Sequence, residues 1–395
     1  MMQTGLEVLL ANDALLTQLS KCRTAVLAHA ASVTQTGEHI IFALRRHGID
    51  PVKIFAPEHG LWGAAQDMEG VDHGFDTIVE RNIISLYGHS LDSLSPDDAL
   101  LDDLDAVIID IQDVGARYYT FVYTALFLTQ AALKKGLHVY FIDRPNPINA
   151  TQTEGNLIQP DFHSFVGMRS VMTRHGMTAG ELISMWCTLE NTPNRQNLHI
   201  SWMNQYDRKA YYDQTGCFWA MPSPNMPNIE TAIIYPGMCL IEGTNLSEGR
   251  GTTRPFEVFG APWVNSNAVC TALKLLNLPG IAFRPLDFKP MFQKHALKTC
   301  HGLEMHVTDR NTFKPVLTGI AILCVMHALH EEFAWRTETY EFVNDRLAID
   351  LLFGNDNIRK SIETQCNPYK IVEPFEEETR EWILLRKQFL HYADS

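Results

Sequence analysis

Several features that would mark a secreted, membrane-bound or zinc-binding protein are absent from this 395-residue sequence. Its first residues, MMQTGLEVLLANDALLTQL, carry no basic residue ahead of the apolar ones and do not predict a signal peptide. No apolar run approaches the ~20 residues that span a bilayer. The longest candidate, 317–335, contains two histidines and two glutamates and predicts a buried helix. The sequence therefore gives no indication of a membrane partner.

The cysteines and the charge narrow the class of protein further. Eight cysteines occur without any CxxC pair, and most have apolar neighbours, as in SMWC and AILCVM. This pattern is typical of reduced, buried thiols, so we expect a cytoplasmic location and no zinc–cysteine site. The formal net charge of −14 argues against nucleic acid as a partner. An acidic small molecule remains possible as a substrate, because a few arginines in a cleft can outweigh the overall charge.

What the sequence does contain is a regular alternation of strand and helix patterns in its first 150 residues. Apolar runs typical of buried strands occupy 23–31, 52–60, 106–115 and 138–147, and helical spacing occupies 36–48 and 119–136. This rhythm predicts an α/β fold with a Rossmann-like parallel sheet covered by helices. No GxGxxG follows the strands, so a dinucleotide is unsupported and no cofactor is expected.

The length of the chain favours two domains, because a single core rarely grows beyond roughly 250–300 residues. A polar, glycine-rich region at 153–263 is followed by ordinary alternation of apolar and polar residues. We therefore expect a Rossmann-like catalytic domain over 1–265 and a smaller C-terminal α/β auxiliary domain over 266–395.

Charged residues gather where the predicted strands end. One strand is followed by Glu58 and His59, another ends in Asp110, Gln112 and Asp113, and a third ends in Asp143, Arg144 and Asn146. Open α/β sheets bind ligands outside the carboxyl ends of their strands. Three strands that deliver polar residues to one edge therefore predict a site there.

Seven motifs, taken in order, resemble one family. They are FAPEHGLWG (55–63), SLYG (85–88), DIQDVGARYYT (110–120), DRPNP (143–147), RHGMTAGEL (174–182), SPNMPN (223–228) and EGTNLSEGRGTTRPFEVFGAPW (242–263). The sequence resembles the exo-β-N-acetylmuramidase (NamZ-type) family over nearly its whole length. The resemblance implies a metal-independent glycosidase that removes non-reducing-end N-acetylmuramic acid from peptidoglycan fragments, with its cleft between a Rossmann-like domain and an auxiliary domain. Many members carry an export signal, which this sequence lacks, and this favours action on imported fragments in cell-wall recycling.

Glycoside hydrolysis commonly needs two carboxyl groups, one that donates a proton to the leaving oxygen and one that acts as nucleophile or base. We expect Glu58 to be the acid, because it follows Pro57 in a turn beside apolar residues. The alternative is a carboxylate that caps the next turn. Glu242, Glu248 and Asp113 are the candidates for the second group, with an Asp113–Arg117 ion pair as the structural alternative. Their separation decides between retention and inversion of configuration, and the sequence leaves it open.

N-acetylmuramic acid differs from N-acetylglucosamine by a lactyl ether with a carboxylate, which an arginine would recognise. Arg250 is the first candidate and Arg117 the second; the alternative is an arginine paired with Glu242 or Glu248. The other substrate-binding candidates adjoin the same motifs: His59, Tyr118, Asp143, Arg144, Asn146, His175, Asn225, Asn245 and Glu248. Asn146 is equally suited to a turn. Asp110 and Glu181 are expected to be structural, Glu181 within a Thr-x-x-Glu capping box.

Two rival functions belong to other classes. A metal-dependent hydrolase could use His59, Asp113, His175 and Glu242 as ligands, but no HExxH or HxH spacing supports it. A non-catalytic sugar sensor could share the same architecture. The density of carboxylates at the strand ends favours an enzyme, because a protein that only binds an anionic sugar gains little from acidic neighbours.

Overall fold

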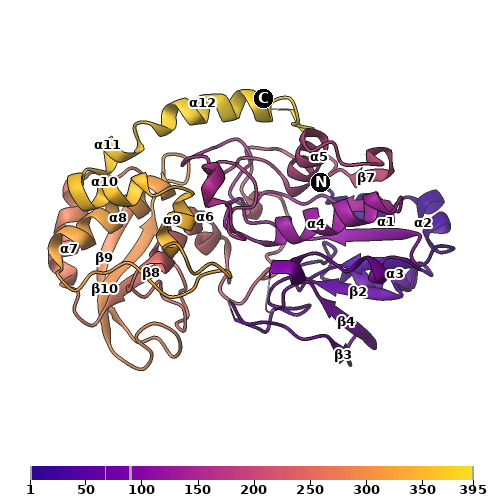
Figure 1. The fold of residues 1–395 in the computed structure, drawn as a ribbon, viewed down its shortest axis with the longest axis horizontal. Helices are drawn as coiled ribbons and strands as arrows, with labels where there is room; N and C mark the ends of the chain where they lie inside the picture. The colour runs from indigo at the N-terminus through magenta and orange to yellow at the C-terminus, as the bar shows by residue number, and fades with distance from the viewer. Residues whose placement is uncertain (1, 67, 89–90, 394–395) are drawn as a thin grey trace.

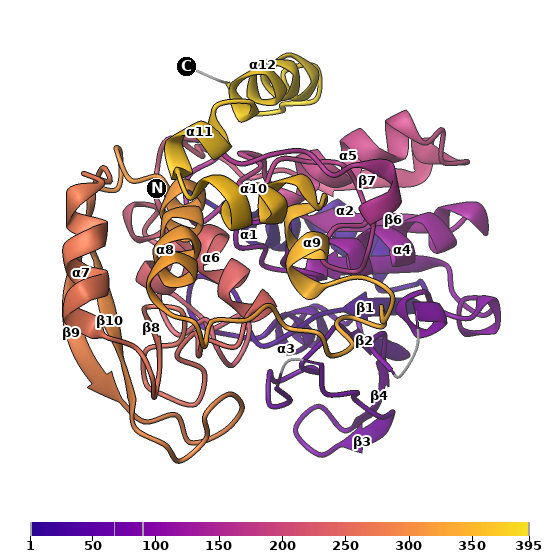
Figure 2. The same cartoon turned by 60° about the vertical axis from the view of Figure 1, so that its left-hand side comes forward.

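The computed structural model describes residues 2–66, 68–88 and 91–393, and within these residues the strands form two sheets. Figure 1 shows the sheets side by side, with the N-terminal half on the right and the C-terminal part on the left. The last helix, α12 (Phe375–Arg386), passes from the smaller half back over the top of the larger one, and the turned view in Figure 2 shows the same arrangement. The two halves are thus joined both by the chain between them and by this returning helix.

The larger sheet has seven strands in the order β3-β4-β2-β1-β5-β6-β7. Its members are β1 (Thr24–Leu27), β2 (Lys53–Ala56), β3 (Gly74–Asp76), β4 (Arg81–Ser85), β5 (Ala106–Asp110), β6 (His138–Ile142) and β7 (Leu198–Ser201). Only the edge strand β3 pairs in antiparallel fashion. When the six parallel strands are counted along the chain, their order is 3-2-1-4-5-6, which is the order of Rossmann folds. The predicted fold class is confirmed.

Helices cover this sheet because their apolar faces pack against the apolar side chains of its buried strands. They include α1 (Gly5–Leu10), α2 (Asp13–Leu19), α3 (Ile40–Arg46), α4 (Phe121–Lys134) and α5 (Ala179–Leu189). The central strands are fully buried, as expected for a parallel sheet with helices on both faces. Each predicted strand ends several residues earlier than its sequence pattern suggests, because the polar residues that follow leave the sheet and make contacts in loops.

The point where the strand order reverses lies between β1 and β5, and His29 occupies it. The Nε2 atom of His29 accepts a hydrogen bond from the Gln112 amide at 2.8 Å, and Nδ1 lies 3.3 Å from the carbonyl oxygen of Pro222. Burial lowers the pKa of His29 to about 3, so the ring is neutral and can accept on one nitrogen and donate on the other. The position that holds a ligand in dinucleotide-binding relatives of the fold is therefore occupied by a buried side chain.

The smaller sheet is antiparallel, in the order β8-β10-β9. Its strands are β8 (Val258–Ala261), β9 (Ile281–Phe288) and β10 (Cys300–Val307), and the helices of this part are α6 (Ile229–Met238), α7 (Ser266–Leu275), α8 (Pro315–Leu329), α9 (Ala348–Phe353), α10 (Asn357–Gln365) and α11 (Pro368–Val372). The buried helix predicted within 317–335 corresponds to α8. Along the described residues, no helix is long and apolar enough to cross a membrane.

Helices α6 and α8 approach each other closely at a pair of glycines. A Cβ atom on Gly237 would lie 1.9 Å from the carbonyl oxygen of Pro315, and one on Gly319 would lie 2.3 Å from the carbonyl oxygen of Gly237. Only glycine fits such a backbone contact. This contact fixes α6, and with it the segment that follows α6, against the smaller half. The division of the chain after residue 265 remains a prediction.

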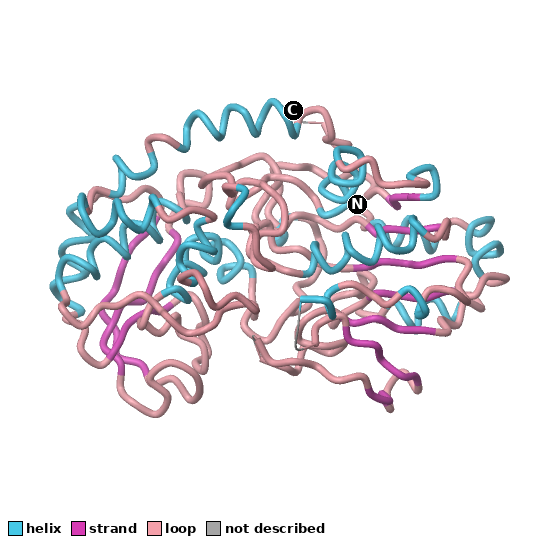
Figure 3. Tube along the Cα trace, viewed as in Figure 1, coloured by secondary structure: helices cyan, strands magenta, loops and turns pink. Residues whose placement is uncertain are grey.

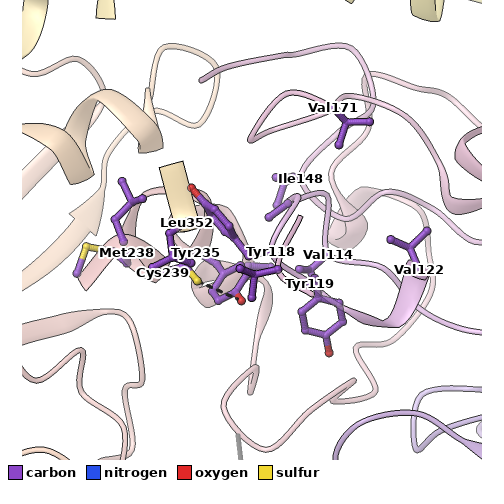
Figure 4. Packing of buried hydrophobic residues seen from close by; sticks show 14 of the residues in the cluster. Val114, Tyr118, Tyr119, Val122, Ile148, Val171, Tyr235, Met238, Cys239 and Leu352 are labelled. Carbon is purple, nitrogen blue, oxygen red and sulfur yellow. Dashed lines mark hydrogen bonds between the residues drawn. The ribbon is translucent and has the colours of Figure 1, made fainter. Parts of the chain in front are cut away.

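A continuous apolar core joins the two halves. Figure 4 shows Tyr118 and Tyr119, which precede α4, packed near Tyr235 and Cys239 from the end of α6. The rings of Tyr118 and Tyr235 meet edge to face with centroids 6.3 Å apart. Since side chains of both halves share this core, the loops on either side of it are held in fixed relative positions.

Candidate active site between the two sheets

The space between the sheets is built mostly from loops, as Figure 3 shows. An inner pocket of about 40 Å³ lies there, lined by the segments around Glu58 and Thr120 from the larger half and around Glu242, Arg250 and Tyr340 from the smaller half. This volume holds only one or a few water molecules. Residues that are far apart in the sequence therefore meet around one small polar space.

Glu58 reaches this pocket because the chain turns sharply after β2. Pro57 cannot donate to the sheet, and His59 and Gly60 both adopt left-handed backbone angles, with φ of 70° and 78°. The Oε2 atom of Glu58 accepts a hydrogen bond from the Thr120 hydroxyl at 2.7 Å, and Oε1 lies 3.4 Å from the Met68 amide. Glu58 is only 5% exposed, and the structure gives it no ion pair with any described residue. One carboxyl oxygen is thus held firmly and the other weakly.

Glu242 lies in the 3-10 turn η6 (Cys239–Gly243), directly after α6. Its Oε1 accepts a hydrogen bond from Arg250 at 2.7 Å and its Oε2 accepts one from the Tyr340 hydroxyl at 2.7 Å. Burial, and then the charge of Glu242, raise the pKa of Tyr340 well above its usual range, so the tyrosine stays protonated and donates. A cation and a hydroxyl therefore both favour the ionised form of Glu242.

Arg250 holds two carboxylates at once. Besides its bond to Glu242, its Nε lies 3.4 Å from Glu248 Oε1, and its guanidinium stands 5.0 Å from the centre of the Phe256 ring. The second oxygen of Glu248 binds Lys294 at 2.9 Å. The pairing that the sequence left as the alternative for Arg250 is therefore the one the structure contains.

A third carboxylate, Glu341, also lines the inner pocket and was not expected from the sequence. Its Oε2 accepts a hydrogen bond from the Tyr87 hydroxyl at 3.2 Å, across the two halves. Both Glu341 and Phe342 have left-handed backbone angles, with φ of 46° and 67°. The surrounding sequence ETYEFVND has no motif that would mark it, so only the tertiary structure identifies this residue.

An outer groove of about 700 Å³ adjoins the inner pocket, and Glu242 lines both. The groove is also lined by Met68, whose amide faces Glu58, and by Lys294, Trp335 and Arg336. A volume of this size lies within the range of sites for small organic ligands. The outer groove thus reaches Glu242 directly, and it reaches the neighbourhood of Glu58 through Met68.

The structure places the candidates from the sequence in three positions. Those on the inner pocket are Glu58, His59, Tyr118, Asn225, Glu242 and Arg250. Asn245 and Glu248 line the outer groove, where Asn245 is held by the Glu332 carbonyl at 2.7 Å and the Ala334 amide at 3.1 Å. The remaining candidates, Asp113, Arg117, Asp143, Arg144, Asn146 and His175, line neither space.

The two remaining arginine candidates require a correction, because buried groups of the protein bind them. Arg117 donates to the carbonyl oxygens of Val171 at 3.0 Å and Leu352 at 2.8 Å, and so links the two halves. Arg144 forms a buried bidentate pair with Asp110, as the structural expectation for Asp110 implied. Neither guanidinium faces the inner pocket or the outer groove.

Asp143 and Asn146 need the same correction. The Asp143 carboxylate accepts hydrogen bonds from Thr178 at 2.9 Å, from the Gly180 amide at 2.8 Å and from Tyr392 at 2.6 Å. Asn146 forms a turn, since its side chain accepts from the Ile148 amide at 3.1 Å and donates to the Met177 carbonyl at 2.9 Å. The turn alternative for Asn146 and the capping box of Thr178 and Glu181 are both present.

Asp113 and His175 lie close to each other and line neither the inner pocket nor the outer groove. Asp113 Oδ2 accepts from the Gly115 amide at 2.7 Å and lies 3.2 Å from His175 Nε2. The alternative Asp113–Arg117 ion pair is not formed. Among the described residues, no group of three or more histidine, cysteine, aspartate or glutamate side chains is arranged to hold a metal ion. The four residues weighed as metal ligands therefore do not form such a group.

Comparison with known proteins gives one consistent family. Family models described as exo-beta-N-acetylmuramidase NamZ match residues 24–230 with the N-terminal domain and residues 233–392 with the C-terminal domain. The peptidoglycan beta-N-acetylmuramidase NamZ of Bacillus subtilis (strain 168) is 36% identical and aligns with 99% of this chain and 91% of its own length.

Two crystal structures of DUF1343 family proteins from Bacteroides fragilis NCTC 9343 share the whole architecture. One superposes with a TM-score of 0.85 and 26% identity over 99% of both chains. The other has a TM-score of 0.75 and 25% identity over 100% of both chains. Both halves of the molecule, and the way they are joined, are therefore features of these solved structures as well.

Proposed function

The chain belongs to the NamZ family of exo-β-N-acetylmuramidases, and from this premise we propose that its inner pocket cleaves non-reducing-end N-acetylmuramic acid from peptidoglycan fragments. The chain is accordingly a glycoside hydrolase. The observation that supports the pocket as its site is the meeting of Glu58 and Glu242, two buried carboxyl groups from different halves of the molecule, around one space. Two opposed carboxyl groups are what glycoside hydrolysis commonly requires.

The different partners of the two carboxyl groups support a division of roles. Glu242 is bound by the cation of Arg250, whereas Glu58 has a hydroxyl on one oxygen and only a distant amide on the other. We assign Glu242 to the ionised role, as base or nucleophile, and Glu58 to the role of proton donor to the leaving oxygen. Pairs of carboxyl groups in unequal surroundings divide these tasks in glycosidases. The configuration of the released sugar, read by NMR, distinguishes base from nucleophile.

The two volumes support a position for the substrate. The inner pocket of about 40 Å³ cannot contain a sugar ring as it stands, whereas the outer groove of about 700 Å³ can. A saccharide in the groove would contact Glu242 and Met68, which both line it, and Met68 lies beside Glu58. We propose that the scissile bond lies where groove and pocket meet, with the inner pocket holding the water or the substituents of the cleaved ring.

The direct test is incubation with para-nitrophenyl N-acetylmuramide and, in parallel, with para-nitrophenyl N-acetylglucosaminide. We expect release of para-nitrophenol from the muramide at a rate far above that from the glucosaminide, and no loss of rate with a chelator. A protein that binds N-acetylmuramic acid but leaves the muramide intact would be the sugar sensor instead. Loss of activity with a chelator, restored by a divalent metal ion, would favour the metal-dependent hydrolase.

We also propose that the protein acts on imported fragments in the cytoplasm. All eight cysteines lie in the described part of the chain and all are free thiols. Unpaired cysteines are usual in a reducing compartment. Fractionation of the producing cells, with the muramidase activity measured in each fraction, tests this location. Recovery of the activity outside the cytoplasmic fraction would contradict it.

A further inference from the structure

We propose that Arg336 recognises the lactyl carboxylate of N-acetylmuramic acid. The assignment rests on the proposed function, because it names the residue that would let the groove distinguish this sugar from N-acetylglucosamine. Arg336 belongs to the segment between α8 and α9, which the sequence motifs do not include. It lines the outer groove.

The position of Arg336 ties it to the reaction centre. Its backbone amide donates to the Gly243 carbonyl at 2.9 Å, next to Glu242. Its guanidinium lies 5.2 Å from the centre of the Tyr340 ring, and the hydroxyl of that ring binds Glu242 at 2.7 Å. One tyrosine ring thus separates the cation from the carboxylate. The lactyl ether and the cleaved bond are both on the same sugar ring, so their recognition requires two protein groups at this kind of spacing.

Arg336 also keeps hydrogen-bond donors for a ligand. Within the described residues its ion pair is with Glu338 at 3.9 Å, and the Glu338 side chain is 76% exposed. Its other polar contact is with the Met68 sulfur at 3.8 Å, and a thioether is a weak acceptor. The Tyr340 ring lies against the guanidinium, and Arg336 lines the groove. A carboxylate that enters the groove can therefore form the two parallel bonds that arginine prefers.

The other positively charged side chains nearby are bound by groups of the protein itself. Arg250 is 7% exposed and contacts both Glu242 and Glu248, so a substrate carboxylate would have to displace one of them. Lys294 donates to the Ile241 carbonyl at 3.0 Å, the Leu246 carbonyl at 2.9 Å and Glu248 at 2.9 Å. These two residues hold the catalytic segment together, and Arg336 stands at the wall of the groove with a long, exposed ion pair. The specificity expected from the sequence for Arg250 is better supplied by Arg336.

The experiment compares a charged ligand with its neutral form. Binding of N-acetylmuramic acid and of its methyl ester is measured by calorimetry for the wild-type protein, for Arg336→Gln and for Arg169→Gln as matched control. Arg169 is similarly half-buried and pairs with Glu190, outside the groove. We expect wild type and control to bind the acid about tenfold or more tightly than the ester, and Arg336→Gln to bind both alike. Melting temperatures check that each variant is folded.

Kinetics on the para-nitrophenyl muramide and its methyl ester supply the second readout. Arg336→Gln should raise KM for the acid, leave the ester nearly unaffected and change kcat little. Retention of the wild-type acid-to-ester ratio in Arg336→Gln overturns the proposal. So does an equal fall of kcat on both substrates, which would mean that Arg336 only supports Tyr340. If the wild-type protein cleaves neither muramide, the proposed function fails, and the calorimetry still decides whether Arg336 reads the carboxylate.

Discussion

Two groups of charged residues lie near the middle of this molecule, and they differ in what they bind. At the ends of β5 and β6, the charged groups of Asp110, Asp143 and Arg144 are bound by other groups of the protein itself. Around the inner pocket, Glu58 has one oxygen with only a 3.4 Å amide contact, and Glu242 lies between the pocket and an open groove. A charged residue at a strand end therefore indicates a functional site only where that residue also lines a pocket or groove.

The comparison distinguishes residues that stabilise the fold from residues that take part in catalysis. Buried polar groups with all their partners in place hold loops in position, and their removal leaves the partner uncompensated. Groups with an open edge contribute less to the fold and can exchange protons or bonds with a ligand. Changes in the first group should alter the free energy of unfolding, and changes in the second should alter turnover.

The largest effect is expected at the pocket. Glu58→Gln keeps the hydrogen bond from Thr120 but cannot donate a proton as an acid, so kcat on a muramic acid–glucosamine disaccharide should fall about 10²- to 10⁴-fold. The melting temperature should stay within a degree or two of wild type. Steady-state kinetics and thermal unfolding of the purified variant measure both. Wild-type turnover in a folded Glu58→Gln protein would remove Glu58 from the mechanism.

At the buried Asp110–Arg144 pair we expect a substitution to change the stability of the protein and not its turnover. Asp110→Asn leaves the Arg144 guanidinium buried without its charge partner and should lower the free energy of unfolding by about 3–5 kcal/mol. The activity per folded molecule should remain near wild type. The control is Asp103→Asn, which breaks the half-exposed pairs with Arg23 and Lys53 and should cost less than about 1 kcal/mol for each pair. Equal denaturation midpoints in urea for the two variants would erase the distinction between the two groups of residues.

A smaller effect is expected from the hydroxyl that holds Glu242. Tyr340→Phe removes a bond to a charged group, which contributes about 1.5–3 kcal/mol, and should lower kcat about tenfold or more. Tyr369→Phe, whose hydroxyl donates at the surface to the carbonyl oxygens of Leu276 and Asn277, far from any carboxylate of the site, should behave as wild type. Rates measured under saturating muramide compare the two. Equal activity in both variants would mean that Glu242 needs no orientation by Tyr340.

The last effect concerns the dependence of stability on pH. Burial raises the pKa of Asp143 from 3.8 to about 7, although Tyr392 and two other donors oppose the shift. Between these two values the folded protein retains a proton that the unfolded chain has released, so this stabilisation is full below about pH 4 and is lost as the pH rises through 7. Asp143→Asn should therefore lose less stability than wild type between pH 5 and pH 8. The free energy of unfolding of both proteins is measured by urea titration at each pH. An equal fall with pH in the two proteins would contradict this account of Asp143.

The central strands could be predicted from the sequence because a buried parallel strand is a continuous apolar run, as in AVIID of β5. The edge strands β3 and β7, and β4 beside β3, carry exposed or half-exposed residues, and their patterns are correspondingly weak. The early ends of the strands also escaped prediction. The predicted ranges 52–60 and 138–147 run past the observed ends of β2 and β6, and only tertiary contacts show where the chain leaves the sheet.

The candidate site was predictable where a motif and the pocket coincide. Glu58, Glu242 and Arg250 stand in loops with glycine and proline, and such loops often line sites. Tyr340 and Glu341 come from a segment without a motif, and they reach the pocket only because that segment folds back against η6. In the other direction, the sequence placed Arg117 at the site because it cannot show the carbonyl groups that bind it.

The most direct test of the central claim compares two leaving groups in the Glu58→Gln variant. Para-nitrophenolate departs with little need of a proton, whereas the sugar alcohol of a muramic acid–glucosamine disaccharide must be protonated as it leaves. If Glu58 is the acid at the junction of pocket and groove, kcat/KM should fall at least tenfold more for the disaccharide than for the para-nitrophenyl muramide. Equal losses on the two substrates would contradict the account, because they would mean that Glu58 does not protonate the leaving oxygen.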